Sequence, residues 1–319
     1  MSTTAGRSRL KAIALWLVGA IAFAALVMYL VPSWDDLTGR ADVAAPYLLV
    51  GLAGAALAHV AVAARWKLLS EATGGTRLGF WAYLHSLLVT RFIGQFAPSL
   101  AMDLVGRGVA LRTVGSKRGV GHATTLVVLE RLFDLIIPAA LVLWAFAVRR
   151  PGLEDQAAGL LALTTAAFLL IATPGLRPLA RLALRVYARV ARVPDGELPV
   201  GVTTWIAFQV ALLGVARFAA VLVQFAGIGA GVGIFLGWSD WMAATPLAQL
   251  TALVGLTPGG LGVVEAGWWA GLAWVGVEGP IIGLFLLAQR TALIAFLGTL
   301  ALASWPLARG GAKRARTTA

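Results

Sequence analysis

The chain has 319 residues, of which 60% are hydrophobic and 13% are charged, and its formal net charge is +12. It contains no cysteine, which excludes disulfide bonds and cysteine-ligated metals. Because the basic residues lie between long apolar runs, the positive charge is typical of cytoplasmic membrane-protein loops and does not indicate nucleic-acid binding. Runs of about 20 apolar residues predict an all-α polytopic membrane protein, which we expect to form a single integral membrane domain over residues 1–319.

The first two predicted spans cover residues 12–31 and 43–64. A basic N-terminus leads into the first span without a cleavage site, which predicts a retained signal anchor. The acidic loop between the spans is typical of the outside. The basic loop after the second span, with Arg65 and Lys67, is typical of the cytoplasmic side. The N-terminus is therefore expected in the cytoplasm.

Residues 80–111 interrupt this alternation of sides. The segment is apolar to about residue 96, yet basic residues flank it on both ends, so both ends are predicted inside. We interpret it as a re-entrant hairpin of two half-helices with its tip at Ala97-Pro98-Ser99. A full crossing that leaves the later basic residues outside is the alternative.

The next predicted spans cover residues 120–148 and 156–173, and an amphipathic helix follows at 176–193. Basic side chains recur on this helix at four-residue spacing and share one face: Arg177, Arg181, Arg185 and Arg189. The pattern favours an interfacial helix on the anionic lipids of the inner leaflet. A solvated connecting helix is the alternative.

A fifth span is predicted at residues 200–224 and a sixth at 280–307, followed by a basic, cytoplasmic C-terminal tail. Between them, residues 240–277 are apolar but contain Thr257-Pro258-Gly259-Gly260. Proline and glycine weaken a helix interior, and an open backbone at membrane depth requires protein or water around it. We interpret this segment as a second re-entrant hairpin that enters from the outside.

The two predicted hairpins indicate an inverted-topology repeat. Pro98 and Pro258 lie 160 positions apart, and a shift of 160 places the second span on the fifth and the third span on the sixth. The repeat halves are about 43–148 and 203–308. The expected fold is therefore about six full spans and two re-entrant broken-helix hairpins.

Charged side chains within the apolar runs are the candidate functional residues, because an ionised group at a helix centre costs at least about 2.5 kcal/mol on insertion scales. We interpret Glu265, Arg131 and Arg290 as functional. Asp103, Glu130 and Arg91 suit either function or helix pairing. Arg107 is open to a role as a cytoplasmic-end cation, and a structural role is favoured for Asp134 and Arg217.

The N-termini of the returning half-helices are expected to attract an anion such as phosphate, which the planar fork of arginine also suits. The residues predicted to bind or translocate the substrate are Pro98, Asp103, Arg107, Glu130, Arg131, Pro258, Gly259, Gly260, Glu265 and Arg290. His59, His85 and His122 have no metal-ligand spacing, and no nucleophile motif occurs. We therefore expect no catalytic residue, no metal and no cofactor.

Three stretches resemble a known family in order along the chain. They run from Ala97 to Arg107, through Glu130-Arg131-Leu132-Phe133-Asp134, and from Pro258 to Glu265. They resemble the flippase-like integral membrane family related to the transmembrane region of lysylphosphatidylglycerol synthases. Ala101-Met102 and Val264 depart from its pattern. We expect the soluble aminoacyl-transferase domain of the synthases to be absent. The resemblance therefore implies a lipid translocator that is not an enzyme.

We therefore expect a flippase of the plasma (inner) membrane that moves an anionic or phosphate-bearing lipid, either a phospholipid or a polyprenyl-phosphate-linked lipid. Two alternatives remain open. One is a secondary transporter of a small soluble anion, and the other is a non-catalytic membrane partner of a separate lipid-modifying enzyme.

Overall fold

The computed structural model describes residues 45–149, 156–191, 201–255 and 257–317. Within these ranges the chain is helical apart from its loops and one isolated bridge. The first predicted span, at residues 12–31, lies outside the described residues. The long helices are α3 (Ala45–Ala72), α7 (Val120–Val148), α8 (Ala157–Ala191), α9 (Thr204–Gly231) and α12 (Gly279–Thr317).

Four of these helices, α3, α8, α9 and α12, are long and apolar enough to cross a membrane by length and composition. Helix α7 has 29 residues, but it carries Glu130, Arg131 and Asp134 near its middle. Helix α3 continues to Ala72, beyond the predicted end at residue 64. Arg65, predicted to lie in a loop, is therefore helical. It is also buried, and its charge pairs with Asp134 on α7.

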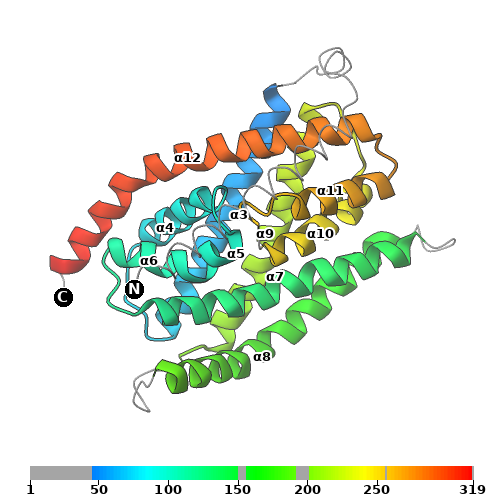
Figure 1. Cartoon of the computed structure of the whole chain (residues 1–319). Helices are drawn as coiled ribbons and strands as arrows, with labels where there is room; N and C mark the ends of the chain where they lie inside the picture. Colours follow the sequence, from blue (N-terminus) through cyan, green and yellow to red (C-terminus); the bar gives the residue numbers. More distant parts are fainter. Residues whose placement is uncertain (1–44, 150–155, 192–200, 256, 318–319) are drawn as a thin grey trace, which may run out of the picture.

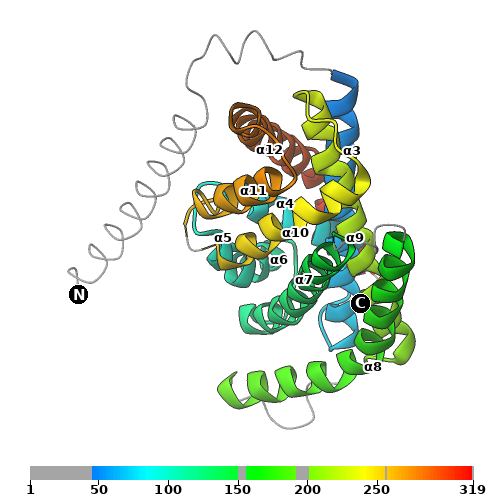
Figure 2. The same ribbon diagram turned by 90° about the vertical axis from the view of Figure 1, so that its right-hand side faces the viewer.

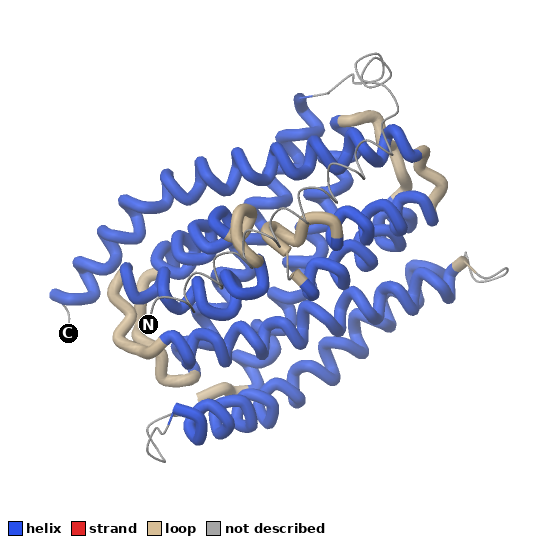
Figure 3. The backbone as a smooth tube through the Cα atoms, viewed as in Figure 1, coloured by secondary structure: helices blue, strands red, loops and turns tan. Residues whose placement is uncertain are grey.

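Two helical hairpins occupy the centre of the bundle. The first consists of α4 (Phe80–Ile93) and a returning arm built from α5 (Ser99–Ala101), the π-helical turn η1 (Met102–Gly106) and α6 (Arg107–Thr113). The second consists of α10 (Trp238–Val254) and α11 (Val263–Trp274). Figure 1 shows the hairpins entering from opposite ends of the bundle, and the loops at their tips lie near its middle in Figure 3.

Helices α3 and α9 pack against each other through glycine. A Cβ atom added at Gly54 would lie 2.5 Å from the backbone nitrogen of Gln224, and one added at Gly227 would lie 2.4 Å from the backbone nitrogen of Gly51. Real Cβ atoms do not approach backbone this closely. Small residues therefore allow the two helix backbones to touch, as they do in many membrane bundles.

Each hairpin has an apolar core of its own. Around the first, Trp66 of α3 meets Tyr83 of α4 edge to face, with ring centroids 5.2 Å apart. Around the second, Trp268 of α11 packs on Phe225 and Phe285.

The predicted fourth span and interfacial helix are one continuous helix in the structure, so their predicted separation is wrong. Helix α8 contains Pro174 and Pro178, and Figure 2 shows it bent into two arms. Proline commonly kinks a long helix without ending it. The four arginines on the second arm are exposed, whereas Leu176, Ala180 and Leu184 are buried against the bundle.

Candidate functional site

The tips of the two hairpins are bonded to each other. Pro98 and Pro258 form an antiparallel bridge, and the backbone nitrogen of Gly259 donates to the carbonyl oxygens of Gly94 (2.9 Å) and Ala97 (3.1 Å). Gly259 adopts a φ of 61°, in the left-handed region that favours glycine. We call this set of backbone bonds the tip contact.

Arg290 of α12 reinforces the tip contact from the side. Its Nη1 donates to Gln95 Oε1 (3.0 Å) and to the carbonyl oxygen of Gly259 (2.9 Å), and its Nη2 donates to Glu265 Oε1. The second oxygen of Glu265 accepts from the backbone nitrogen of Gly262 at 2.8 Å. The positive end of α11 therefore already holds a carboxylate from its own first turn, so the anion expected there is part of the protein.

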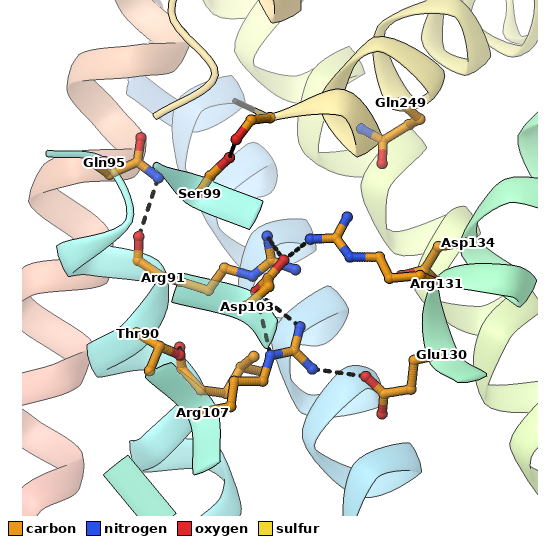
Figure 4. Close-up of polar contacts among 12 residues, drawn as sticks. Thr90, Arg91, Gln95, Ser99, Asp103, Arg107, Glu130, Arg131, Asp134 and Gln249 are labelled. Carbon is orange, nitrogen blue, oxygen red and sulfur yellow. Dashed lines mark hydrogen bonds and ion pairs between the residues drawn. The ribbon is translucent and has the colours of Figure 1, made fainter. Parts of the chain in front are cut away.

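Three arginines converge on Asp103 in the returning arm of the first hairpin (Figure 4). Arg107 Nη2 lies 3.1 Å from Asp103 Oδ1, Arg91 Nη1 lies 3.3 Å from Oδ2, and Arg131 also contacts Oδ2. Asp103 is 2% exposed. One buried carboxylate thus joins α4, η1, α6 and α7.

A second group of charges continues from the first across α7. Glu130 accepts from Arg107 Nη1 at 2.7 Å and lies 3.8 Å from Arg65 Nε. Asp134 Oδ1 lies 3.0 Å from Arg65 Nη2 and 3.4 Å from Arg217 Nη1. The eight linked side chains form what we call the buried ion cluster: Arg65, Arg91, Asp103, Arg107, Glu130, Arg131, Asp134 and Arg217.

A polar cavity of about 170 Å³ opens beside this cluster, and we call it the arginine cavity. Arg91, Arg131 and Arg217 line it from three different helices, and Gln95 and Leu253 place it next to both hairpin tips. Its volume is several times the roughly 30 Å³ of one liquid water molecule. Its remaining polar lining consists of His59, Gln224, Gln249 and Asp134.

A larger, apolar cavity of about 1090 Å³ lies between α4, the returning arm of the first hairpin and α12. Its lining includes Ile93, Val105 and Leu302, which are 43%, 50% and 79% exposed. The cavity has no Arg, Lys, Asp or Glu in its lining. Its surface suits hydrocarbon, in contrast to the arginine cavity on the other face of α4.

The structure divides the predicted site residues into two groups. Asp103, Arg107, Glu130 and Arg131 belong to the buried ion cluster, whereas the others lie at or beside the tip contact: Pro98, Pro258, Gly259, Gly260, Glu265 and Arg290. Of the ten, only Arg131 lines the arginine cavity. Glu265 and Asp103 lie in these separate groups.

Several residues that line the cavity or pair with its charges were missed by the sequence reasoning. The sequence favours a structural role for Arg217 and Asp134, yet both line the arginine cavity together with His59, Gln95 and Gln249. Arg65 is not among the candidates that the sequence predicts. The available signal was the presence of glutamine and arginine inside apolar helices, where polar side chains usually have a partner or a use.

The part of the chain that the structure describes holds no group of three His, Asp or Glu side chains placed to bind a metal ion. The arrangement instead offers guanidinium groups and side-chain amides, which donate hydrogen bonds. Paired guanidinium donors bind phosphate and carboxylate oxygens.

A comparison with protein families matches residues 11–301 to a family model described as the lysylphosphatidylglycerol synthase TM region. The match covers most of the chain and confirms the resemblance drawn from the three motifs. No curated protein matches the chain.

Proposed function

The chain belongs to the family of the lysylphosphatidylglycerol synthase transmembrane region, a membrane family connected with phospholipid handling, and from this premise we propose that it is a lipid flippase. It moves an anionic or phosphate-bearing lipid between the leaflets of the plasma membrane and does not change it chemically. The observation that carries this proposal is the arginine cavity, which lies beside the hairpin tips and is lined by Arg91, Arg131 and Arg217.

The two halves of the chain act as an inverted repeat within one integral domain. A shift of 160 residues carries α3 onto α9, α4 onto α10 and α7 onto α12, each within two residues at its start. The packing supports this assignment. Helix α3 packs against α9, its equivalent in the other half, and the contact between α4 and α12 is equivalent to the contact between α10 and α7. In such repeats the substrate site lies near the midplane, between the two halves.

The tip contact is the closed gate of the transport path. The headgroup enters the arginine cavity, while the hydrocarbon chains stay in lipid. Gln95 connects the two regions, because it lines the cavity and accepts a hydrogen bond from Arg290 at the tips. Occupancy of the cavity is thereby coupled to the bonds that hold the tips together.

A direct test uses purified protein in vesicles that contain a headgroup-labelled anionic lipid. We expect movement between leaflets faster than in protein-free vesicles, and we expect Arg131→Gln to reduce it by about tenfold or more through the loss of a phosphate contact. Lys67→Gln removes a partly exposed charge that pairs with Glu71 and does not line the cavity, and it is the matched control. Wild-type rates in Arg131→Gln would contradict the site, and no movement above protein-free vesicles would contradict the function.

A secondary transporter of a small soluble anion remains the second candidate, and the small volume of the arginine cavity favours it. The exposed apolar cavity along α4 and α12 favours a lipid instead. Uptake of radioactive inorganic phosphate into the same vesicles, without lipid movement, would support the soluble-anion function.

We place the N- and C-termini and the second arm of α8 on the cytoplasmic side. On this arm Arg177, Arg181, Arg185 and Arg189 are exposed together with Leu179, Leu182 and Val186. Basic side chains beside exposed apolar ones suit the surface of an anionic leaflet. This arm would rest on the inner leaflet.

A further inference from the structure

The buried ion cluster contains unequal numbers of positive and negative side chains. Its five arginines, Arg65, Arg91, Arg107, Arg131 and Arg217, are linked by ion pairs to three acids, Asp103, Glu130 and Asp134. Arginine stays protonated in proteins, and each acid of the cluster pairs with two or three arginines. The cluster therefore carries an excess of two positive charges. The separate pair of Arg290 and Glu265 is balanced.

The excess charge lies at the arginine cavity. Arg65 and Arg107 are only 1% and 2% exposed, and each of them pairs with two acids. Arg91, Arg131 and Arg217 face the cavity and are 28%, 18% and 15% exposed. The cavity wall thus presents cationic donors that the protein's own acids do not neutralise.

Resting on the proposed lipid function, we propose that the arginine cavity selects a phosphate group that carries two negative charges, either a phosphomonoester or a diphosphate. A dianion brings the cluster to neutrality. A phosphodiester headgroup with one charge leaves one positive charge uncompensated, and a zwitterionic headgroup leaves two. Charge interactions are stronger near protein of low dielectric constant than in water, so each uncompensated charge weakens binding.

The geometry suits a group with several terminal oxygens. Guanidinium forks approach the cavity from α4, α7 and α9, and the amides of Gln95, Gln224 and Gln249 line the same space. A terminal phosphate has three oxygens free for such donors, whereas a diester has two. Bidentate contacts from arginine to phosphate oxygens then fix the headgroup in place.

Two substitutions lower the excess positive charge in different ways. Arg217→Gln removes one positive charge, and Gln249→Glu adds one negative charge beside it, because Gln249 Oε1 accepts from Arg217 Nη2 at 3.3 Å. Either change reduces the excess from two to one. A shared effect of the two variants reports charge, because one deletes the arginine and the other keeps it. Lys67→Gln changes the net charge of the protein outside the cavity and is the control.

The experiment measures binding and movement separately at pH 8. Binding is titrated by thermal stabilisation of the detergent-solubilised protein, with phosphatidic acid as the dianionic lipid, phosphatidylglycerol as the monoanionic lipid and inorganic phosphate as the free dianion. We expect wild type and Lys67→Gln to bind phosphatidic acid about tenfold or more tightly than phosphatidylglycerol. In Arg217→Gln and Gln249→Glu we expect this ratio to fall below one, because a monoanion then neutralises the remaining excess charge and a dianion leaves one negative charge uncompensated.

Equal binding of the two lipids by the wild type, or an unchanged ratio in both variants, would overturn the proposal. Inorganic phosphate that binds as tightly as phosphatidic acid would keep the dianion selectivity and assign it to a free phosphate. Movement of both lipids across vesicles is then measured with the same proteins. Selective binding without movement would overturn the flippase function and leave the dianion site standing. Movement without selective binding would overturn the dianion selectivity and leave the flippase function standing.

Discussion

Asp103 is the residue on which the most arginine side chains converge. It holds Arg91, Arg107 and Arg131 together, and it is itself 2% exposed. A buried carboxylate is stabilised only while its partners remain, and the partners equally depend on it. Arg290 has a similar role at the tips, where Glu265 neutralises it. At this scale the same charges serve packing and line the proposed binding site, since the cluster that holds α4, α6 and α7 together also lines the arginine cavity.

The first prediction concerns Asp103→Asn. Loss of this carboxylate leaves three arginines facing one another, so we expect the free energy of unfolding to fall by about 3–5 kcal/mol. Denaturant titration in detergent micelles measures this change. The control is Glu71→Gln, because Glu71 pairs with Lys67 one helical turn away at a partly exposed site and should contribute about 0.5 kcal/mol or less. Equal losses in the two variants would contradict the assignment of Asp103.

At the scale of elements, the hairpin tips depend on backbone geometry more than on side-chain chemistry. Gly259 donates to two carbonyl groups of the opposite tip and has a positive φ. Ser99 and Leu100 of the first hairpin both bond to the carbonyl oxygen of Gly255 in the second. Two broken helices therefore satisfy each other's open backbone groups where their tips meet.

The second prediction compares two glycines that both have positive φ. In Gly259→Ala the new Cβ atom would lie 2.8 Å from the backbone oxygen of Gln95, whereas in Gly276→Ala it meets nothing within 4 Å. Both variants carry the conformational cost of about 1–2 kcal/mol. We expect Gly259→Ala to lose about 1–3 kcal/mol more, because the tips must separate.

Denaturant titration of the two alanine variants measures this difference, and a transport assay shows whether the separated tips also leak. Equal stability of the two variants would show that the tip contact is not tightly packed.

At the scale of the whole molecule, two hairpins from opposite ends meet at one contact beside one polar cavity. If the halves alternate in opening, the tip contact must break on one side during each cycle. In the proposed function, the arrangement of charges then decides which headgroup stabilises the path, and the apolar lining along α4 and α12 faces the hydrocarbon chains.

The third prediction locks the tip contact. Because the chain has no cysteine, Pro98→Cys with Pro258→Cys introduces a single possible disulfide. Opposed residues of an antiparallel pair lie about 4.5–5.5 Å apart at Cα, within the range that a disulfide spans. We expect the oxidised double variant to lose lipid movement and to regain it after reduction, while each single variant is insensitive to oxidant. If the fully cross-linked protein moved lipid as fast as the same protein after reduction of the disulfide, the tips would not need to separate.

The fourth prediction concerns the sidedness of the hairpins. Thr113 lies at the open end of the first hairpin and Ser239 at that of the second, and both are exposed. In intact cells we expect a membrane-impermeant thiol reagent to label Ser239→Cys and to leave Thr113→Cys unlabelled until the membrane is permeabilised. Labelling of both positions from outside would contradict the inverted arrangement and favour a full crossing at residues 80–111.

Much of the helical pattern follows from the sequence alone. Apolar runs specify α3, α7, α9 and α12 to within a few residues at one end, and Pro98 and Pro258 mark both helix breaks. These features are local, since chain periodicity and proline chemistry act over one or two helical turns. The same local reasoning failed at Pro174 and Pro178, where packing against the bundle sustains a bent helix.

The sequence by itself determined which charges of the cluster lie in apolar segments, apart from Arg65, and where the two hairpins turn. Only the tertiary structure decided which of those charges meet. Arg65 finds Asp134 across 69 positions, and Arg290 finds Gln95 across 195. Such pairs depend on the rotation of each helix about its axis and on the depth of each hairpin, and neither quantity is set by neighbouring residues. For that reason the sequence identified Arg131, whereas the fold was needed to place it with Arg91 and Arg217 around one cavity with two unneutralised charges.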